Sequence, residues 1–139
     1  MFSVTRELTF CYGHRLLDYA GKCRHLHGHN GRAVITLSAP ALDGLGMVVD
    51  FSLLKRIVGG WIDANLDHKM LLHRDDPALP LLRSLGEPVF VTDTNPTAEA
   101  IARLIFDAVV RHEFPVVEVR LWETDSSVAT YCSRQRRAE

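Results

Sequence analysis

The chain has 139 residues, 47% of them apolar, and its 16 basic and 17 acidic side chains leave a net charge of −1. This length and composition are ordinary for a globular protein, so we expect a single domain over residues 1–139. The balanced charge does not favour nucleic acid or a membrane surface as a partner, and no apolar run approaches the length that spans a bilayer.

The cysteine count and the first residues of the chain indicate the cellular compartment of the protein. The chain has three cysteines, and its first residues are charged where a signal peptide needs an apolar run. An odd count without an export signal favours reduced thiols over a disulfide framework, so we expect a cytoplasmic protein. We expect the arginine-rich tail at 134–137 to be a solvated end rather than a binding patch.

The first predicted strand covers residues 2–14. Its even-numbered positions are mostly apolar and its odd-numbered positions mostly polar, which is typical of a half-buried strand. His14 continues the apolar parity at the end of this strand. Residues 15–26 have no clear period, so we expect a loop.

A second strand is predicted from about residue 29 to residue 41, with Ala33, Ile35 and Leu37 on its apolar parity. His27 and His29 extend this parity backwards. We therefore expect the two histidines to meet His14 at strand ends on one face of the sheet.

These three histidines predict a metal site. Side chains two residues apart on an extended segment leave the same face, and Gly28 between His27 and His29 lets the backbone pass close to an ion. Imidazole is the commonest metal ligand, and a catalytic zinc usually takes three protein ligands. Cupin-type barrels also use a His-X-His pair, but they need a glutamate a few residues later, which 30–34 lacks. We expect His14 to complete the site, with Cys23 nearby as a thiol that need not be a ligand.

Two helices are predicted after these strands. Apolar residues at steps of three and four predict a helix from Asp50 or Ser52 to near Leu66. A second helix should begin at Asn95-Pro96-Thr97-Ala98-Glu99, with Asn95 as the N-cap, and should end before Pro115. Between them lies a long connection, 67–95, with a short helix expected within 77–85 and a short extended piece at 89–91.

The last predicted strands cover 116–123 and 128–133, and Glu123 falls on the apolar parity of the first of them. The order β-β-α-α-β-β predicts an α+β domain with a four-stranded antiparallel sheet and two helices on one face. The open edges of such a sheet would be closed by neighbouring subunits.

Six segments of the chain together resemble a known family. They are His14, Cys23–Asn30, Gly46–Phe51, Leu66–His68, Pro96–Glu99 and Val119–Thr124. In this order they resemble the 6-pyruvoyl-tetrahydropterin synthase / 6-carboxy-tetrahydropterin synthase family, whose subunits have the tunnelling fold (T-fold). The segments span nearly the whole chain, and they are specific jointly rather than singly.

The resemblance implies a zinc-dependent lyase. Zn²⁺ would be held by the three histidines, with Cys23 as the catalytic base and Asp67 and His68 as a second proton-handling pair. Glu123 would anchor the pterin ring, and Thr97 would belong to the substrate site. The resemblance also implies a hexamer, built as a dimer of trimers, with active sites between subunits.

The substrate that the resemblance implies is 7,8-dihydroneopterin triphosphate. The leading product is 6-carboxy-5,6,7,8-tetrahydropterin, formed with release of triphosphate and acetaldehyde on the route to queuosine and other deazapurines. Three alternatives stay open: a 6-pyruvoyl product on the biopterin route, retro-aldol cleavage to a 6-hydroxymethyl-dihydropterin, and a non-catalytic pterin- or metal-binding protein on the same fold. Cys23 disfavours the retro-aldol enzymes, which tend to carry glutamate at the base position. The non-catalytic protein would not need Cys23, Asp67 and His68 together.

Each site residue also has a plainer role. Cys23 could be a fourth ligand of a structural zinc site, His68 could cap a helix C-terminus, and Glu123 could mark the surface end of a strand. Thr97 could serve as a helix cap, and we expect Glu99 to serve only in capping. Four basic residues could meet the triphosphate or be ordinary surface charge: Arg15, Arg24, His25 and Arg32.

The chain departs from the family pattern in two places. Cys11-Tyr12-Gly13 stands where small residues usually precede the first zinc histidine. After Asp67-His68 the chain has Lys69–His73, where the family often shows Leu-Asn. Both departures could lie near the side chain of the substrate, so they leave the exact product open.

Overall fold

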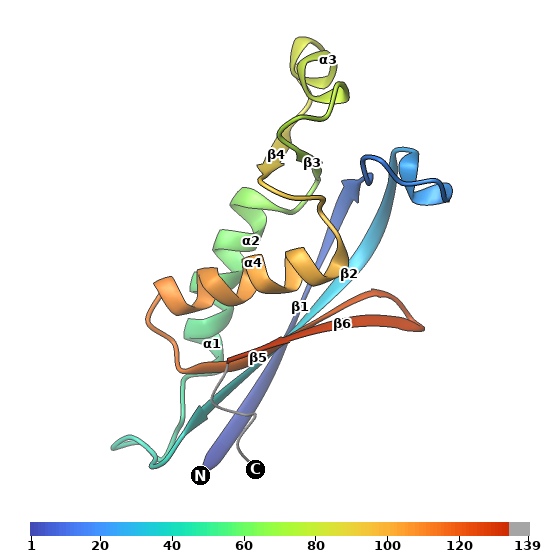
Figure 1. The fold of residues 1–139 in the computed structure, drawn as a ribbon. Helices are drawn as coiled ribbons and strands as arrows, with labels where there is room; N and C mark the ends of the chain where they lie inside the picture. Colours follow the sequence, from blue (N-terminus) through green and yellow to red (C-terminus); the bar gives the residue numbers. More distant parts are fainter. Residues whose placement is uncertain (134–139) are drawn as a thin grey trace.

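The computed structural model describes residues 1–133, so the basic tail at 134–137 lies outside the described part. The strands form one sheet in the order β4-β3-β1-β2-β5-β6 (Figure 1). They are β1 (Phe2–His14), β2 (His27–Ala39), β3 (Lys69–His73), β4 (Val89–Thr92), β5 (Val116–Thr124) and β6 (Ser127–Cys132). The helical segments are η1 (Lys22–Arg24), α1 (Phe51–Leu54), η2 (Lys55–Gly59), α2 (Gly60–Asn65), α3 (Ala78–Ser84) and α4 (Ala98–Arg111).

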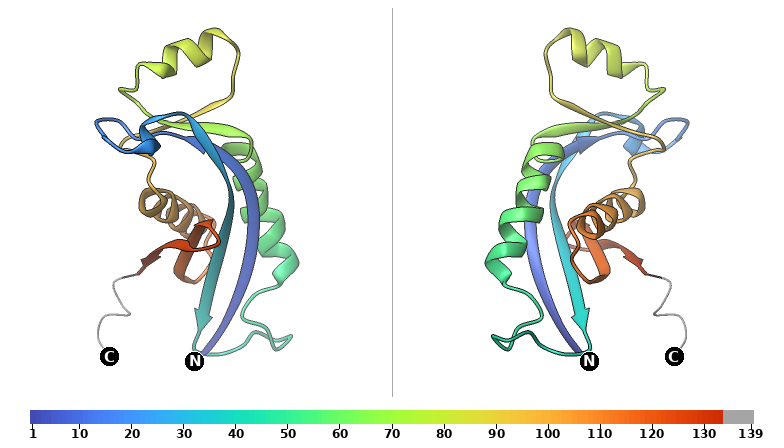
Figure 2. Two further views of the ribbon diagram at one scale, coloured as in Figure 1. Left: turned by 90° about the vertical axis from the view of Figure 1, so that its right-hand side faces the viewer. Right: turned by 90° about the vertical axis from the view of Figure 1, so that its left-hand side faces the viewer.

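The four strands expected from the sequence lie next to one another and are antiparallel. β1 pairs with β2 without a register shift, from Phe2 opposite Ala39 to His14 opposite His27. β5 pairs with β2, and β6 pairs with β5. The long β1–β2 hairpin is strongly curved in both side views (Figure 2). The predicted α+β class is confirmed.

The sheet has six strands rather than the four expected. β3 runs parallel to the end of β1, and β4 runs parallel to β3, with α3 in the connection between them. β3 was not predicted because its sequence does not alternate between apolar and polar residues: Leu71 and Leu72 are adjacent and both fully buried. The short helix and the extended piece expected at 77–85 and 89–91 are present as α3 and β4.

The first predicted helix is one helical run that comprises α1, η2 and α2. Asp50 caps its start, since its Oδ1 accepts a hydrogen bond from the Ser52 N–H at 2.8 Å. The middle part, η2, is a π-helical turn. Such turns are rare and usually short insertions in α-helices.

α4 begins two residues later than expected. The N-cap is Thr97, whose Oγ1 accepts from the Ala100 N–H at 3.1 Å. The prediction of Asn95 as the cap is wrong. Both residue types suit this role, and the side chain of Asn95 is instead bound to the backbone of Leu17 at 2.9 and 3.0 Å.

One hydrophobic cluster joins the sheet to the helices. On the strands it contains the apolar parity predicted from the sequence: Leu8, Phe10, Tyr12, Ala33, Ile35, Leu37, Val119 and Leu121. On the helical run and α4 it contains Leu54, Val58, Ile62, Leu66, Ile101, Ala102, Ile105, Phe106 and Val109. The helices therefore cover this face, while the odd-numbered positions of β1 are mostly exposed. None of the helices in residues 1–133 is both long and apolar enough to span a bilayer.

Both edges of the central sheet are open over much of their length. β3 meets β1 only at Tyr12–His14, so within residues 1–133 the outer edge of β1 from Phe2 to Cys11 has no strand partner. β6 forms the opposite edge of the sheet. The loop that carries η1 and the β3–α3–β4 unit gather at the far end of the hairpin from the N-terminus (Figure 1).

Candidate metal centre and active site

The ends of β1 and β2 bring three histidines together. The Nδ1–H of His14 donates to the Pro96 carbonyl at 2.7 Å, and that of His27 donates to the His25 carbonyl at 2.7 Å. A carbonyl partner on Nδ1 leaves Nε2 as the nitrogen with a free lone pair, and this arrangement is typical of metal-bound histidines. One ligand atom from each of His14, His27 and His29 lies within 4.8 Å of the others.

The buried nitrogens of this cluster need a partner. The Nε2 atoms of His14, His27 and His29 are buried without a hydrogen-bond partner. Buried polar atoms are nearly always paired, so such a group calls for an explanation. A divalent metal ion that accepts all three lone pairs would satisfy them at once. The donor set therefore fits a metal ion.

The protonation state of the histidines suits ligation. Burial lowers the pKa of His14, against the opposing effects of the Pro96 carbonyl and Glu123. Burial also lowers the pKa of His29. Imidazole binds a metal in its neutral form, so this environment keeps the site ready for the ion near neutral pH.

A carboxylate lies beside the three nitrogens. The Tyr12 hydroxyl donates to Glu123 Oε1 at 3.0 Å, and the same oxygen lies 3.3 Å from His14 Nε2 and 3.6 Å from His29 Nε2. Burial, followed by Glu123, raises the pKa of Tyr12, so the phenol stays a donor. A Cβ at Gly31 would meet the Tyr12 ring at 2.9 Å, so the glycine makes room for it. Tyr12 thus holds Glu123 at the centre.

The structure shows that Gly28 also serves the pairing of the two strands. A Cβ at this position would meet the Tyr12 carbonyl oxygen at 3.1 Å. The missing side chain therefore allows close pairing with β1, on which His14 lies.

A cavity of about 340 Å³ opens beside the centre. His14, Cys23, Thr97, Glu99 and Glu123 line it together with apolar neighbours. Thr97 uses an oxygen lone pair to cap α4, which leaves its hydroxyl proton available to a ligand. From the sequence we expected Glu99 to serve only in capping, and its place in the cavity is new. No sequence pattern distinguishes a glutamate that caps a helix from one that lines a cavity.

Asp67 and His68 form a pair on a different wall. His68 Nδ1–H donates to Asp67 Oδ2 at 2.9 Å, and Asp67 Oδ1 accepts from the Cys11 N–H at 2.9 Å. The Cys11 N–H, with a smaller effect from His68, lowers the pKa of Asp67. His68 has a positive φ of 56°, which is rare outside glycine, and its side chain is 79% exposed. The pair is thus oriented by the backbone of Cys11, with His68 open to solvent.

The structure separates this pair from Cys23 within one chain. His68 borders a second cavity of about 460 Å³, shared with His27 and Met70, which Cys23 does not line. Cys23 lines the cavity at His14 and Glu123. Its sulfur does not belong to the group of close metal-ligating atoms found in residues 1–133.

The basic candidates for triphosphate binding mostly have internal partners. Arg15 forms a bidentate ion pair with the fully buried Asp76 and lowers the pKa of that carboxyl. The Arg32 guanidinium lies 5.3 Å from the centre of the Trp122 ring. Arg24 donates weakly to the Ala20 carbonyl at 3.4 Å.

The chain and its fold have counterparts among known proteins. The family model described as 6-pyruvoyl tetrahydropterin synthase matches residues 3–134. The chain belongs to this family. The 6-carboxy-5,6,7,8-tetrahydropterin synthase of Rickettsia typhi is 37% identical over 133 residues, which cover 91% of this chain and 96% of that protein. The protein of the same description from Haemophilus influenzae is 34% identical over 139 residues, covering 94% and 99%.

A solved structure supports the fold of this 6-pyruvoyl tetrahydropterin synthase family member. The Caenorhabditis elegans 6-pyruvoyl tetrahydropterin synthase superposes with a TM-score of 0.71 at 22% identity, covering 95% of each chain. The expected tunnelling fold is confirmed.

The two departures from the family pattern have definite places in this family member. Tyr12 holds Glu123 beside the histidines. The Lys69–His73 segment forms β3, in which the side chains of Leu71 and Leu72 are fully buried.

Proposed function

We propose that the protein is a zinc-dependent lyase that converts 7,8-dihydroneopterin triphosphate and one water molecule to 6-carboxy-5,6,7,8-tetrahydropterin, triphosphate and acetaldehyde. The observation that carries the proposal is the set of three unpaired, buried imidazole nitrogens next to a cavity lined by Cys23 and Glu123. Relatives named for this product, at 34–37% identity over nearly their whole length, support it. We place the protein in the cytoplasm, on the route to queuosine and other deazapurines.

The histidines are assigned to the metal. His14, His27 and His29 would hold Zn²⁺ through Nε2, with the first two rings oriented by backbone carbonyls. Bound zinc would polarise substrate oxygens and stabilise negative charge that develops on them, as a Lewis acid.

Cys23 is assigned as the base. Remodelling the side chain of the pterin requires removal of a proton from carbon next to the ring, and a thiolate is a suitable acceptor. The residue lies in η1 on the wall of the cavity that holds His14 and Glu123, and it is partly exposed. A substrate seated in this cavity would therefore meet the thiol directly.

Glu123 is assigned to the pterin ring, as the resemblance implies. A carboxylate can accept two N–H donors from the pyrimidine edge. Its Oε1 is already bound to Tyr12, so Oε2 would meet the ring. Glu99 supplies a second carboxylate, and Thr97 a hydroxyl donor, in the same cavity.

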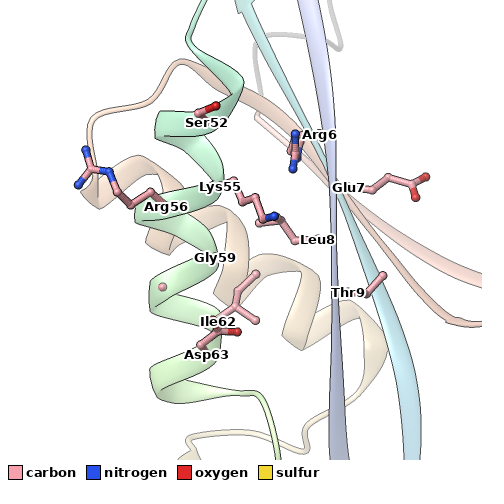
Figure 3. Close-up of a pocket in the computed structure, with 11 residues that line it drawn as sticks. Arg6, Glu7, Leu8, Thr9, Ser52, Lys55, Arg56, Gly59, Ile62 and Asp63 are labelled. Carbon is pink, nitrogen blue, oxygen red and sulfur yellow. The ribbon is translucent and has the colours of Figure 1, made fainter.

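Asp67 and His68 are assigned to the active site of a neighbouring subunit. Within one chain His68, to which Asp67 is hydrogen-bonded, borders a different cavity from Cys23, so the pair would join the chemistry of Cys23 only from another copy. The open edges of β1 and β6 provide surfaces for such a copy in the hexamer that we propose. A hollow of about 630 Å³ between β1 and the helical run flanks this edge of β1, with Arg6, Lys55 and Arg56 around it (Figure 3).

The decisive experiment is mass-spectrometric product analysis after incubation of the zinc-loaded protein with 7,8-dihydroneopterin triphosphate. We expect 6-carboxy-tetrahydropterin and acetaldehyde in equal amounts. A 6-pyruvoyl or 6-hydroxymethyl product would keep the metal and pterin assignments but change the reaction. Bound but unchanged pterin would favour the non-catalytic alternative.

A further inference from the structure

The loop that carries Cys23 is closed by one backbone hydrogen bond. The Leu16 N–H donates to the Cys23 carbonyl at 2.9 Å. Leu16 lies directly after Arg15, at the end of β1, and the loop runs on to His27, where β2 begins. The place of Leu16 therefore determines where the backbone of Cys23 lies.

On one side of Leu16, Arg15 is held by Asp76. Its Nε donates to Asp76 Oδ2 at 2.7 Å, and its Nη2 donates to Oδ1 of the same carboxylate. Oδ1 also accepts from the Ala78 N–H at 2.8 Å, and the Asp76 side chain is fully buried. A bidentate pair of this kind restricts both position and direction of the guanidinium.

On the other side, Leu17 is held by Asn95. Its N–H donates to Asn95 Oδ1 at 2.9 Å, and its carbonyl accepts from Asn95 Nδ2 at 3.0 Å. The amide thus satisfies both backbone groups of Leu17, as a neighbouring strand would. Asn95 also precedes Pro96, whose carbonyl orients His14.

We propose that Asp76 and Asn95 are positioning residues that hold Arg15–Leu17 on both sides and, through the Leu16–Cys23 hydrogen bond, keep the Cys23 thiol in the cavity beside His14. Neither residue touches the cavity itself. Asp76 lies in the connection between β3 and α3, and Asn95 lies in the connection between β4 and α4. These two connections therefore orient the loop that carries the proposed base. The catalytic part of this inference rests on the proposed function, whereas the structural part does not.

Hydrogen exchange tests the structural part. The variants are Asp76→Asn, which keeps the shape and removes the charge, and Asn95→Ala, which leaves the ion pair intact. The matched control is Asp93→Asn, since Asp93 forms an exposed pair with Arg74 at 3.6 Å. In zinc-loaded protein we expect peptides that cover residues 15–26 to exchange about tenfold or more faster in both variants, and unchanged in the control. Unchanged exchange in both variants would overturn the proposal.

Kinetics test the positioning role. A base that is displaced slightly loses rate more than binding, so we expect kcat to fall on the order of a hundredfold with KM and zinc content near the wild-type values. Faster exchange combined with wild-type kcat would show that the loop can move without consequence and would overturn the role. If Asp76→Asn does not fold, Asn95→Ala decides alone.

The two proposals fail in different ways. If the wild-type protein does not turn over the pterin, the proposed function fails. The positioning role is then judged by hydrogen exchange and by the rate at which iodoacetamide modifies Cys23. Peptide mapping measures that rate with Cys132 as the internal control. If Cys23 is modified at the wild-type rate in both variants, the positioning role is overturned.

Discussion

Cys23 lies near the three-histidine cluster without belonging to it. Its sulfur is outside the group of close ligand atoms, although it shares a cavity with His14. We expect Cys23→Ala to lower turnover by at least about a hundredfold, because the base is gone, while zinc stoichiometry stays at the wild-type value. His29→Ala is the matched control and should lose the metal. Metal analysis of the purified variants checks both, and loss of zinc from Cys23→Ala would make the cysteine a ligand.

Two carboxylates line the same cavity, and kinetics can separate their roles. Glu123→Gln keeps the shape but replaces one acceptor oxygen by an NH2 donor and removes the charge, so we expect kcat/KM to fall on the order of a hundredfold as the proposed contact with the pterin is weakened. Tyr12→Phe should cost less, since it removes only one hydrogen bond to Glu123. Glu99→Gln is the matched variant. A larger increase of KM there than in Glu123→Gln would contradict the assignment of the ring to Glu123.

At the residue scale, strand parity in the sequence was enough to predict that the three histidines lie together. His14, His27 and His29 could be placed together because the alternation of two adjacent strands continues through them. The contact of Tyr12 with Glu123 joins residues 111 positions apart on strands that do not pair with each other, and no local pattern indicates it.

At the element scale, the end of α4 stores backbone strain. Glu113 has a φ of 64°, and the Phe114 N–H donates to the Val109 carbonyl at 3.3 Å, which forms the Schellman motif that glycine usually closes. The left-handed conformation costs a residue with a Cβ roughly 1–2 kcal/mol.

We therefore expect Glu113→Gly to raise the free energy of unfolding by about 1 kcal/mol, less than the full strain because glycine also gains entropy when unfolded. Urea denaturation of the zinc-loaded protein measures it. Gly86→Ala, at a φ of 74°, is the control and should lower the free energy of unfolding. A decrease in Glu113→Gly would show that its side chain makes a contact worth more than the strain.

The elements that the sequence revealed are those with a clear period. β1, β2, β5, β6 and the two long helical segments alternate or repeat as a half-buried strand or helix must. β3 was missed because both of its faces are covered, and it pairs with β1 only after the chain has passed through β2 and the helical run. Tertiary burial, rather than local propensity, decides such a strand.

At the scale of the whole molecule, the division of the candidate groups between two cavities predicts complementation. Cys23→Ala and His68→Ala subunits should each be nearly inactive alone. When the two variants are co-expressed and assemble together, turnover should exceed the sum of the separate activities. The reason is that some sites would combine an intact Cys23 with an intact His68 from another copy. Steady-state rates of the mixture, with its assembly state measured by light scattering, check this. An additive result would place both groups in one subunit.

The contacts at the end of β1 restrict where residues can be inserted into or deleted from this chain. Between Cys11 and Arg15, every residue except Gly13 makes such a contact: Cys11 binds Asp67, Tyr12 binds Glu123, His14 belongs to the histidine cluster and Arg15 binds Asp76. Side chains alternate along a strand, so one inserted or deleted residue would turn all later ones to the opposite face and release these partners together. Residues 40–46, which are exposed, hold none of them. Insertions and deletions should therefore be tolerated in that loop and excluded from the last residues of β1.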